Sequence, residues 1–319
     1  MVNRHEQPEI FTDRWGWAEL PKIPDSGIKL NPIKISAMGS CFARNFNRWL
    51  IHHRYTDREQ PWDILYNPFS IHKELERLYS PVPLESHVLK EISVSGEGRF
   101  RDPWRTWLVA KTKEELQSLN SKFDQKAKSH LQNTSAFIIT LGLSEVWCPA
   151  ANPEIVLNQV PTGSIRINKG AWVERFATTI EVQHALIQSV NVVRTHISDK
   201  CPIIFTLSPI PLKFTASQLS IREANNLSKA TLLVALRQLL QERSDVGYFP
   251  SYEIAQALTE RSGGNAWQAD KRHVTAEVVD TICQTFALVY GLEKPRDVRN
   301  RFWVPKVDGE GKIIGKLYT

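Results

Sequence analysis

Two side chains that could act as nucleophiles stand next to each other near the N-terminal end of the sequence. Residues 34–44, KISAMGSCFAR, combine a short β-prone run with Gly39, Ser40, Cys41 and a segment that reads as a helix. Gly39 would let the chain turn sharply, and a serine on such a strand-to-helix turn sits near the positive end of the helix. Because Gly-Ser is also a common turn dipeptide, this pattern alone is weak evidence for catalysis.

A base and an acid that could orient it occur together near the other end of the sequence. Asp270 and His273 are three residues apart in DKRHVT, just ahead of a predicted closing helix. That spacing lets a carboxylate hold the imidazole Nδ1 while Nε2 faces a serine hydroxyl. Glu181 and His184 have a similar spacing, but they fall inside a predicted helix and are interpreted as helix surface.

Strand-like and helix-like segments alternate along the chain, and they must position these residues. The expected strands are residues 33–38, 136–141, 202–207 and 247–250, and the expected helices are residues 42–53, 68–79, 112–131, 174–198, 220–243 and 275–290. The strands are near-continuous apolar runs, which is typical of a parallel sheet covered on both faces. This order predicts a three-layer α/β/α doubly wound sandwich with a mainly parallel central sheet and decorated loops, one of them the β-prone residues 86–109.

In such sheets a ligand binds outside the carboxyl ends of the strands. The residues that follow the expected strand 136–141 are Gly142, Leu143, Ser144 and Glu145. Together with the Ser40 turn and the Asp270–His273 loop, they would meet at one edge of the sheet.

The composition narrows the class of protein. The chain has 319 residues, 42% hydrophobic and 23% charged, which is ordinary for a globular protein. Its longest apolar run, residues 136–142, is too short to span a bilayer, and the polar first residues do not read as a secretory signal, so we expect a cytoplasmic location. The four cysteines form no CxxC pair, which argues against a zinc site or a disulfide framework.

The net charge of +6 admits two interpretations. A solvated basic surface is one, and a surface that attracts anionic ligands, such as an acidic glycan or a nucleotide-bearing donor, is the other. No nucleic-acid-binding motif is present.

The order of these motifs resembles that of the SGNH/GDSL hydrolase superfamily, and within it the GSCFA family. MGSCFARNF at residues 38–46 carries the motif that names the family. Further matching segments are ILYNPFSI (64–71), TLGLSEVW (140–147), FTLSPIPL (205–212), NNLSKATL (225–232), YFPSYEI (248–254) and DKRHVT (270–275). The resemblance spans roughly residues 33–287. We divide the chain into an N-terminal extension (1–30), an SGNH-like GSCFA catalytic domain (31–293) and a basic C-terminal tail (294–319).

The resemblance implies catalytic roles for three residues. Ser40 matches the nucleophile, and its backbone N–H would be one donor to the oxyanion. His273 matches the general base and Asp270 the acid that orients it. Cys41, one residue further into the helix, is expected to point away and pack as a buried inert thiol, although a thiolate at a helix N-terminus is a rival nucleophile.

The oxyanion and substrate-binding residues depart from the superfamily pattern. Gly142, Leu143, Ser144 and Glu145 stand where relatives have Gly-x-Asn-Asp, so that Ser144 replaces the asparagine that donates to the oxyanion. Asn67, just before Pro68, is our candidate for the replacement donor. A helix-entry cap is the competing interpretation of Asn67.

The resemblance implies a serine esterase or O-acyltransferase, with acetyl as the expected group and a carbohydrate or glycan precursor as the substrate. The reaction would pass through an acyl-serine intermediate. No metal and no resident cofactor are expected, and acetyl-CoA is a candidate acyl donor. The alternative is a non-catalytic glycan or nucleotide-sugar binding protein on the same fold. A metal-dependent hydrolase ranks last because the sequence lacks the ligand cluster. We expect no nucleic-acid partner and no membrane span.

Overall fold

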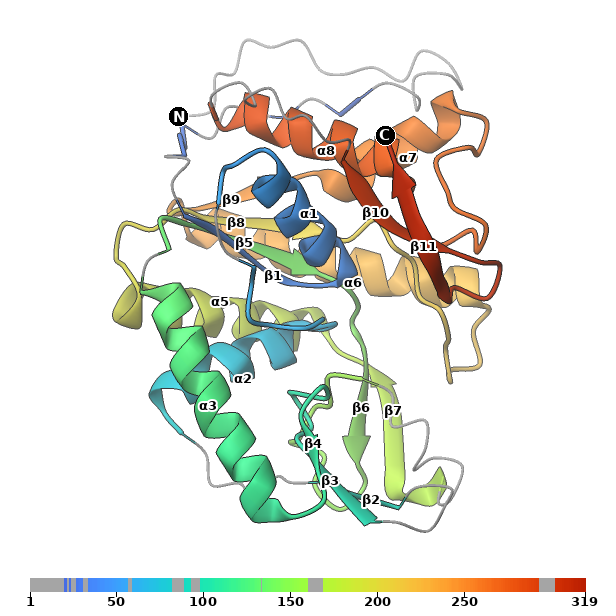
Figure 1. Cartoon of the computed structure of the whole chain (residues 1–319). Helices are drawn as coiled ribbons and strands as arrows, with labels where there is room; N and C mark the ends of the chain where they lie inside the picture. Colours follow the sequence, from blue (N-terminus) through green and yellow to red (C-terminus); the bar gives the residue numbers. More distant parts are fainter. Residues whose placement is uncertain are drawn as a thin grey trace.

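Four parallel strands form the central sheet of the computed structural model, in the spatial order β1 (Ile35–Gly39), β5 (Ala136–Leu141), β8 (Ile203–Leu207) and β9 (Val246–Phe249). The structure describes residues 20–21, 23, 27–30, 34–56, 59–81, 89–92, 98–132, 134–159, 169–292 and 302–319. Every strand of this sheet is almost wholly buried, as the apolar runs predicted. The carboxyl ends of the strands point to the right in Figure 1.

Helices cover both faces of the sheet. One face is covered by α1 (Cys41–His52), α7 (Ser251–Arg261) and α8 (Ala276–Val289), and the other by α2 (Pro68–Tyr79), α3 (Lys113–Leu131), α5 (Thr179–His196) and α6 (Ile221–Glu242). The expected three-layer α/β/α sandwich is therefore confirmed. Within the described residues, no helix combines the length and apolarity needed to cross a membrane.

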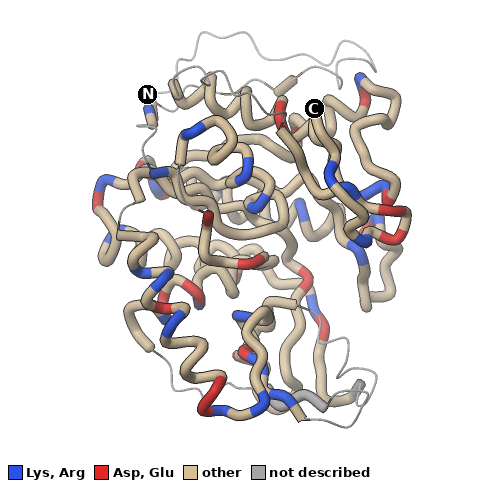
Figure 2. Tube along the Cα trace, viewed as in Figure 1, with Lys and Arg blue, Asp and Glu red and all other residues tan. Residues whose placement is uncertain are grey.

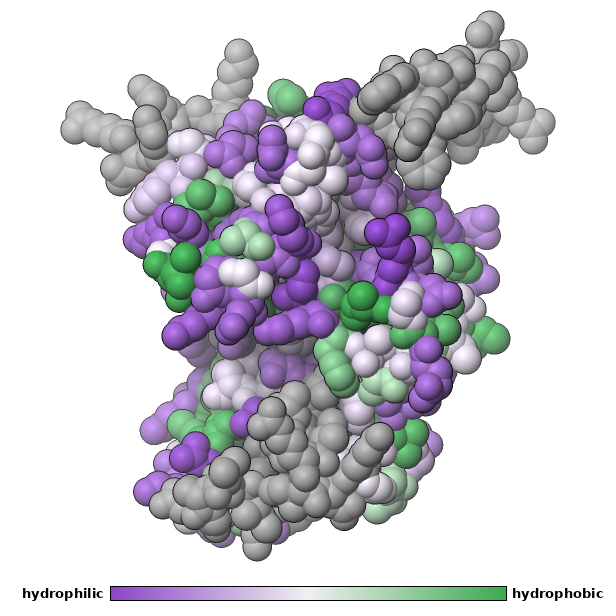
Figure 3. All heavy atoms as spheres, turned by 90° about the vertical axis from the view of Figure 1, so that its right-hand side faces the viewer, coloured by the Kyte–Doolittle hydropathy of each residue, from purple (hydrophilic) through white to green (hydrophobic). Residues whose placement is uncertain are grey.

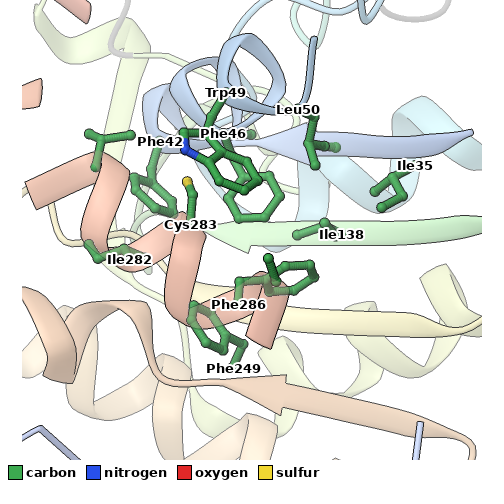
Figure 4. Packing of buried hydrophobic residues seen from close by; sticks show 14 of the residues in the cluster. Ile35, Phe42, Phe46, Trp49, Leu50, Ile138, Phe249, Ile282, Cys283 and Phe286 are labelled. Carbon is green, nitrogen blue, oxygen red and sulfur yellow. The ribbon is translucent and has the colours of Figure 1, made fainter. Parts of the chain in front are cut away.

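Alternation along the strands divides the interior into two hydrophobic cores. On β5, Ile138 faces α1 and α8, while its neighbours Phe137 and Ile139 face the opposite layer. Figure 4 shows the first core, where Phe46 from α1 and Phe286 from α8 meet edge to face with ring centroids 4.9 Å apart. Because side chains of adjacent residues leave a strand on opposite sides, one apolar run supplies both cores.

Smaller sheets decorate the lower half of the molecule in Figure 1. One is a three-stranded sheet of β2 (Leu89–Ile92), β3 (Gly98–Arg101) and β4 (Val109–Ala110). The other pairs β6 (Glu145–Pro149) with β7 (Trp172–Phe176), and β7 follows the 3-10 turn Lys169–Ala171.

The expected helix 174–198 was wrong at its start. Residues up to Phe176 pair with β6, and α5 begins only after Thr178, whose hydroxyl caps the helix in a capping box with Glu181.

The described part of the expected C-terminal tail is an ordered hairpin, β10 (Trp303–Val307) and β11 (Ile313–Tyr318). Phe302 and Val304 are buried in the core of α1 and α8. Arg48 of α1 and Lys316 of β11 each lie over the ring of Trp303, so cation–π contacts add to the packing. The division of the chain at residues 30/31 and 293/294 stays a prediction.

A buried ionic network ties α2 to the segment between β3 and α3. Arg105 is fully buried and makes a bidentate pair with Glu74 of α2, with Nε–Oε2 and Nη2–Oε1 distances of 2.7 and 2.9 Å. Arg77 of α2 contacts Asp102 at 2.6 Å, and Asp102 accepts the backbone N–H of Arg105. Each charge thus has a partner, which burial requires. The network fixes α2, whose N-terminus lies at the candidate site.

We expect Arg105→Met to lower the free energy of unfolding by about 3–5 kcal/mol, because it leaves the carboxylate of Glu74 buried without its partner. Arg175→Met is the control, since the Arg175–Glu181 pair is about one-third exposed and should contribute less than about 1 kcal/mol. Urea unfolding of both variants measures the difference. Equal losses would contradict the assignment of a stabilising role to the buried network.

Candidate active site

The turn between β1 and α1 requires a glycine. Gly39 has a φ of 124°, and a Cβ at this position would lie 2.1 Å from the carbonyl oxygen of Thr140 on β5. No side chain fits in that gap. The close approach lets the N–H of Ser40 donate both to the carbonyl oxygen of Thr140, at 3.0 Å, and to its Oγ1, at 2.9 Å. The N–H of Ser40, expected to be an oxyanion donor, is therefore engaged within the sheet.

The hydroxyl of Ser40 caps α1. Its Oγ accepts the N–H of Phe42 at 3.2 Å and lies 2.9 Å from Oγ1 of Thr140. Only 2% of the residue is exposed. As expected, Ser40 lies on the turn at the carboxyl end of β1, but its hydroxyl is occupied by these structural contacts.

Asp270 and His273 form the pair that the sequence predicted. Nδ1 of His273 lies 2.6 Å from Oδ2 of Asp270, and Oδ1 of Asp270 accepts the backbone N–H groups of Arg272 and His273, each at 3.0 Å. Burial raises the pKa of Asp270, but these hydrogen bonds lower it more, so the net pKa lies below its ordinary value. The carboxylate is therefore held ionised, and it fixes the imidazole with Nε2 turned away from it.

No hydrogen bond joins the ring of His273 to Ser40 or Cys41, all of which are described residues. The side chain of His273 is 24% exposed. The Asp270–His273 contact is thus confirmed, and the structure has no hydrogen bond between the ring of His273 and the hydroxyl of Ser40. That the two groups lie within the looser reach of an empty site stays a prediction. A serine hydroxyl can accept two hydrogen bonds and still donate its own proton, so the contacts with Thr140 and Phe42 do not by themselves exclude a reaction through Ser40.

The Asp270–His273 loop is held by the C-terminal hairpin. The side chain of Gln268 donates to the carbonyl of Pro305 and accepts the N–H of Val307, at 3.0 and 2.9 Å. The backbone N–H of Gln268 donates to the carbonyl of His273 at 2.7 Å. Gly311, in the turn of the hairpin, passes so close to Asp270 that a Cβ there would lie 3.2 Å from Oδ2. Neither Gln268 nor Gly311 carries a sequence signal of this role.

Cys41 as a whole residue is partly exposed. Its thiol lies in a buried environment, which agrees with the expectation of a buried thiol. Burial raises the pKa of the Cys41 thiol, and Arg272, Lys229 and Arg44 oppose that shift. These cations therefore lie near the sulfur. Ser40 is the more buried residue of the pair, because Thr140 draws its hydroxyl into the sheet.

A buried lysine, Lys229 of α6, joins the loops at this edge of the sheet. Its Nζ donates to the carbonyl oxygens of Gly142 and Ser208, each at 2.8 Å, and of Ile210 at 3.2 Å. Three carbonyls match the three protons of an ammonium group. The sequence carries a signal that Lys229 is buried, because it lies on the same helix face as the buried Leu232 and Leu236. The sequence analysis gives Lys229 no role.

The candidate oxyanion residues fall into two groups. The N–H of Gly142 donates no hydrogen bond to any described residue, while the neighbouring N–H of Leu143 donates to the carbonyl of Tyr66 at 2.9 Å. Asn67 is 1% exposed, caps α2 by accepting the N–H of Ser70, and donates its Nδ2 to the carbonyl of Leu157. The backbone N–H of Gly142 could therefore donate to an oxyanion, whereas the contacts of Asn67 are those of a helix cap.

Ser144 and Glu145 are turned into the fold. The N–H of Ser144 donates to the hydroxyl of Ser228 on α6 at 2.7 Å, and Ser144 is fully buried. The carboxylate of Glu145 is also buried and accepts the N–H of Ala216 at 3.0 Å. Their predicted roles at the oxyanion or substrate stay predictions, and each would need a rearrangement of these contacts.

Comparison with known proteins gives one match to this chain. The family model of the GSCFA family matches residues 34–286. No curated protein and no solved structure matches the chain. The matched region contains the β1–α1 turn, Lys229 and the Asp270–His273 loop, and it ends before the hairpin that holds this loop.

We expect Asn67→Ala to lower the free energy of unfolding by about 1–2 kcal/mol, because α2 loses its N-cap. Turnover by the folded variant should change little. Thr112→Ala is the control, since it removes the corresponding cap of α3 far from the candidate site. Loss of turnover by about 10²–10³-fold in a folded Asn67→Ala protein, with none in Thr112→Ala, would instead assign Asn67 to the oxyanion.

Lys229 should make stability depend on pH. Burial lowers its pKa to about 7, with Cys41 opposing and Arg272 adding to the shift. The unfolded chain therefore binds more protons than the folded one between about pH 7 and the ordinary lysine pKa, so stability should rise with pH in that window. We expect a gain of about 2 kcal/mol between about pH 7 and pH 9 that Lys229→Met lacks. Urea unfolding at the two pH values measures it, and equal slopes would contradict the assignment.

Proposed function

The chain belongs to the GSCFA family, and we propose that it is an SGNH-type esterase or O-acyltransferase that works through a covalent acyl-enzyme. The observation that carries the proposal is the Asp270–His273 pair, with Nδ1 held at 2.6 Å by a carboxylate and the imidazole partly exposed at the edge of the sheet where β1 ends. This is the arrangement of a base with its orienting acid.

In the proposed reaction, Nε2 of His273 takes the proton of the nucleophile as the latter attacks an ester carbonyl carbon. The bond to the leaving oxygen breaks, and His273 returns the proton to that oxygen. Water or a sugar hydroxyl then attacks the acyl-enzyme by the same route and frees the nucleophile. Negative charge on the tetrahedral intermediate would be met by the N–H of Gly142, which has no acceptor among the described residues.

The nucleophile comes from the Ser40–Cys41 turn. Ser40 is the residue that the family resemblance assigns, and it is buried with its hydroxyl in contact with Thr140 and Phe42. Cys41 is the second candidate, because three neighbouring cations oppose the loss of its thiolate, although burial still holds the pKa of the thiol above its ordinary value. Both choices lead to an acyl-enzyme and differ only in the attacking atom.

For the substrate we propose an acetylated carbohydrate or a glycan precursor that accepts an acetyl group, with acetyl-CoA as a candidate donor. The alternative is a glycan or nucleotide-sugar binding protein without turnover. The structural occupation of the Ser40 hydroxyl is the observation that favours this alternative.

We expect His273→Ala to reduce p-nitrophenyl acetate hydrolysis by about 10²–10⁴-fold, the usual contribution of a general base. Asp270→Asn should also reduce it, because the imidazole loses its orienting acceptor. His184→Ala is the matched control, since this exposed histidine of α5 has the similar Glu-x-x-His spacing. Unchanged hydrolysis in folded His273→Ala would contradict the proposal.

Labelling by a fluorophosphonate or by an acyl substrate, located by mass spectrometry, identifies the nucleophile. If Ser40 attacks, Ser40→Ala abolishes labelling and Cys41→Ala retains it, and the reverse pattern assigns Cys41. Urea unfolding of Ser40→Ala must accompany the assay, because the variant also loses the cap of α1. A protein that neither labels nor turns over any ester would support the binding alternative.

A further inference from the structure

Arg272 presents a guanidinium group beside His273 with no carboxylate partner among the described residues. Its Nε and Nη2 donate to the carbonyl of Pro211, at 3.3 and 3.2 Å. This contact occupies one edge of the planar group and holds it in place. Nη1 makes no hydrogen bond to a described residue, so the edge formed by Nη1 and Nη2 is open, and the side chain is partly exposed.

The charge of Arg272 lies next to the β1–α1 turn. Burial raises the pKa of both Cys41 and Tyr66, and Arg272 opposes the shift in each case. Arg272 is therefore close to Cys41 on the turn and to Tyr66. It is also the direct neighbour of His273 in the chain. The guanidinium group of Arg272 therefore lies near the residues that the proposed acyl transfer uses, His273 and the Ser40–Cys41 turn.

Positive charge at this end of the sheet is not fully compensated by carboxylates of the described residues. Arg44 pairs with Asp63, and Asp270 is occupied by His273 and two backbone N–H groups. Arg272 has no such partner in the described chain. Figure 2 shows further lysine and arginine residues around the β10–β11 hairpin, and Figure 3 shows hydrophilic and hydrophobic side chains interspersed on the face that is turned toward the viewer.

We propose that the open Nη1–Nη2 edge of Arg272 binds an anionic group of the substrate, a carboxylate or a phosphate. A guanidinium edge matches either group with two parallel hydrogen bonds, and the contact with the carbonyl of Pro211 orients the edge in advance. The anion would hold the substrate beside the nucleophile and His273. The assignment to a substrate rests on the proposed function, but binding at Arg272 can be tested without any turnover.

The thiol of Cys41 is a built-in reporter for anions at Arg272. The residue Cys41 is partly exposed, whereas the other cysteines, Cys148, Cys201 and Cys283, are buried. Iodoacetate is anionic and iodoacetamide is neutral, and both react with the same thiolate. The ratio of their rates at Cys41 therefore measures attraction of the anionic reagent and cancels changes in the thiolate fraction.

We expect the iodoacetate-to-iodoacetamide rate ratio at Cys41 to fall about three- to tenfold in Arg272→Gln, as the Coulomb attraction of a nearby charge in partly aqueous surroundings is lost. Lys271→Gln is the matched control, because Lys271 is the exposed neighbour in the same loop and its loss removes the same charge. Mass spectrometry of the peptide containing Cys41 gives both rates. An unchanged ratio in Arg272→Gln, or an equal fall in Lys271→Gln, would overturn the proposal.

Inorganic phosphate should slow the reaction of wild-type Cys41 with iodoacetate and have little effect in Arg272→Gln. Two further competitors separate the sources of the anion. Protection by adenosine 3′,5′-bisphosphate indicates a nucleotide-bearing acyl donor, and protection by glucuronate indicates an acidic sugar. If none of the three anions protects Cys41, the subsite is absent. Protection without any ester turnover would keep the subsite and reject the proposed acyl transfer.

Discussion

One buried ammonium group holds together the loops from which the candidate site is built. Lys229 reaches from α6 to the carbonyl oxygens of Gly142, Ser208 and Ile210, which follow two neighbouring strands of the parallel sheet. Carbonyl groups at the ends of parallel strands have no strand partner beyond them, and burial without a donor would be costly. The lysine satisfies three of them at once. It thereby fixes the carbonyl group of Gly142, whose N–H donates to no described residue.

The second constraint is the close contact between β1 and β5. Because Gly39 lacks a side chain, Thr140 can bind both the N–H and the hydroxyl of Ser40. The same contact decides which residue of the turn is the more buried. Ser40 is drawn into the sheet and the cap of α1, and Cys41 is the residue left partly exposed among cations. The geometry of the turn thus separates two nucleophiles that the sequence places side by side.

Most of the fold could be predicted from periodicity, because buried parallel strands are short apolar runs and covering helices carry apolar stripes. The run at residues 136–141 and the proline-started helix at 68–79 have the predicted bounds. Residues 172–176 were harder, since Trp172 to Phe176 are paired with β6 rather than continuing into α5. The sequence from Trp172 to the start of α5 contains no helix-start signal before Thr178. Pairing of residues 172–176 with β6 depends on a segment more than 20 residues away, so the local sequence pattern does not reveal it.

The site was predictable only where a motif fixes local geometry. Asp270 and His273 are only three positions apart in one loop, so this spacing predicts the contact between the carboxylate and the imidazole. The exposure of Cys41 and the position of Lys229 depend on contacts between residues far apart in the chain. The same holds for Gln268, whose side chain fastens the Asp270–His273 loop to β10. Since β10 lies beyond residues 34–286, the base of the proposed reaction is held in place by a part of the chain outside the matched family region. The orientation of His273 is therefore a property of the loop and the hairpin together, and not of the family motif by itself.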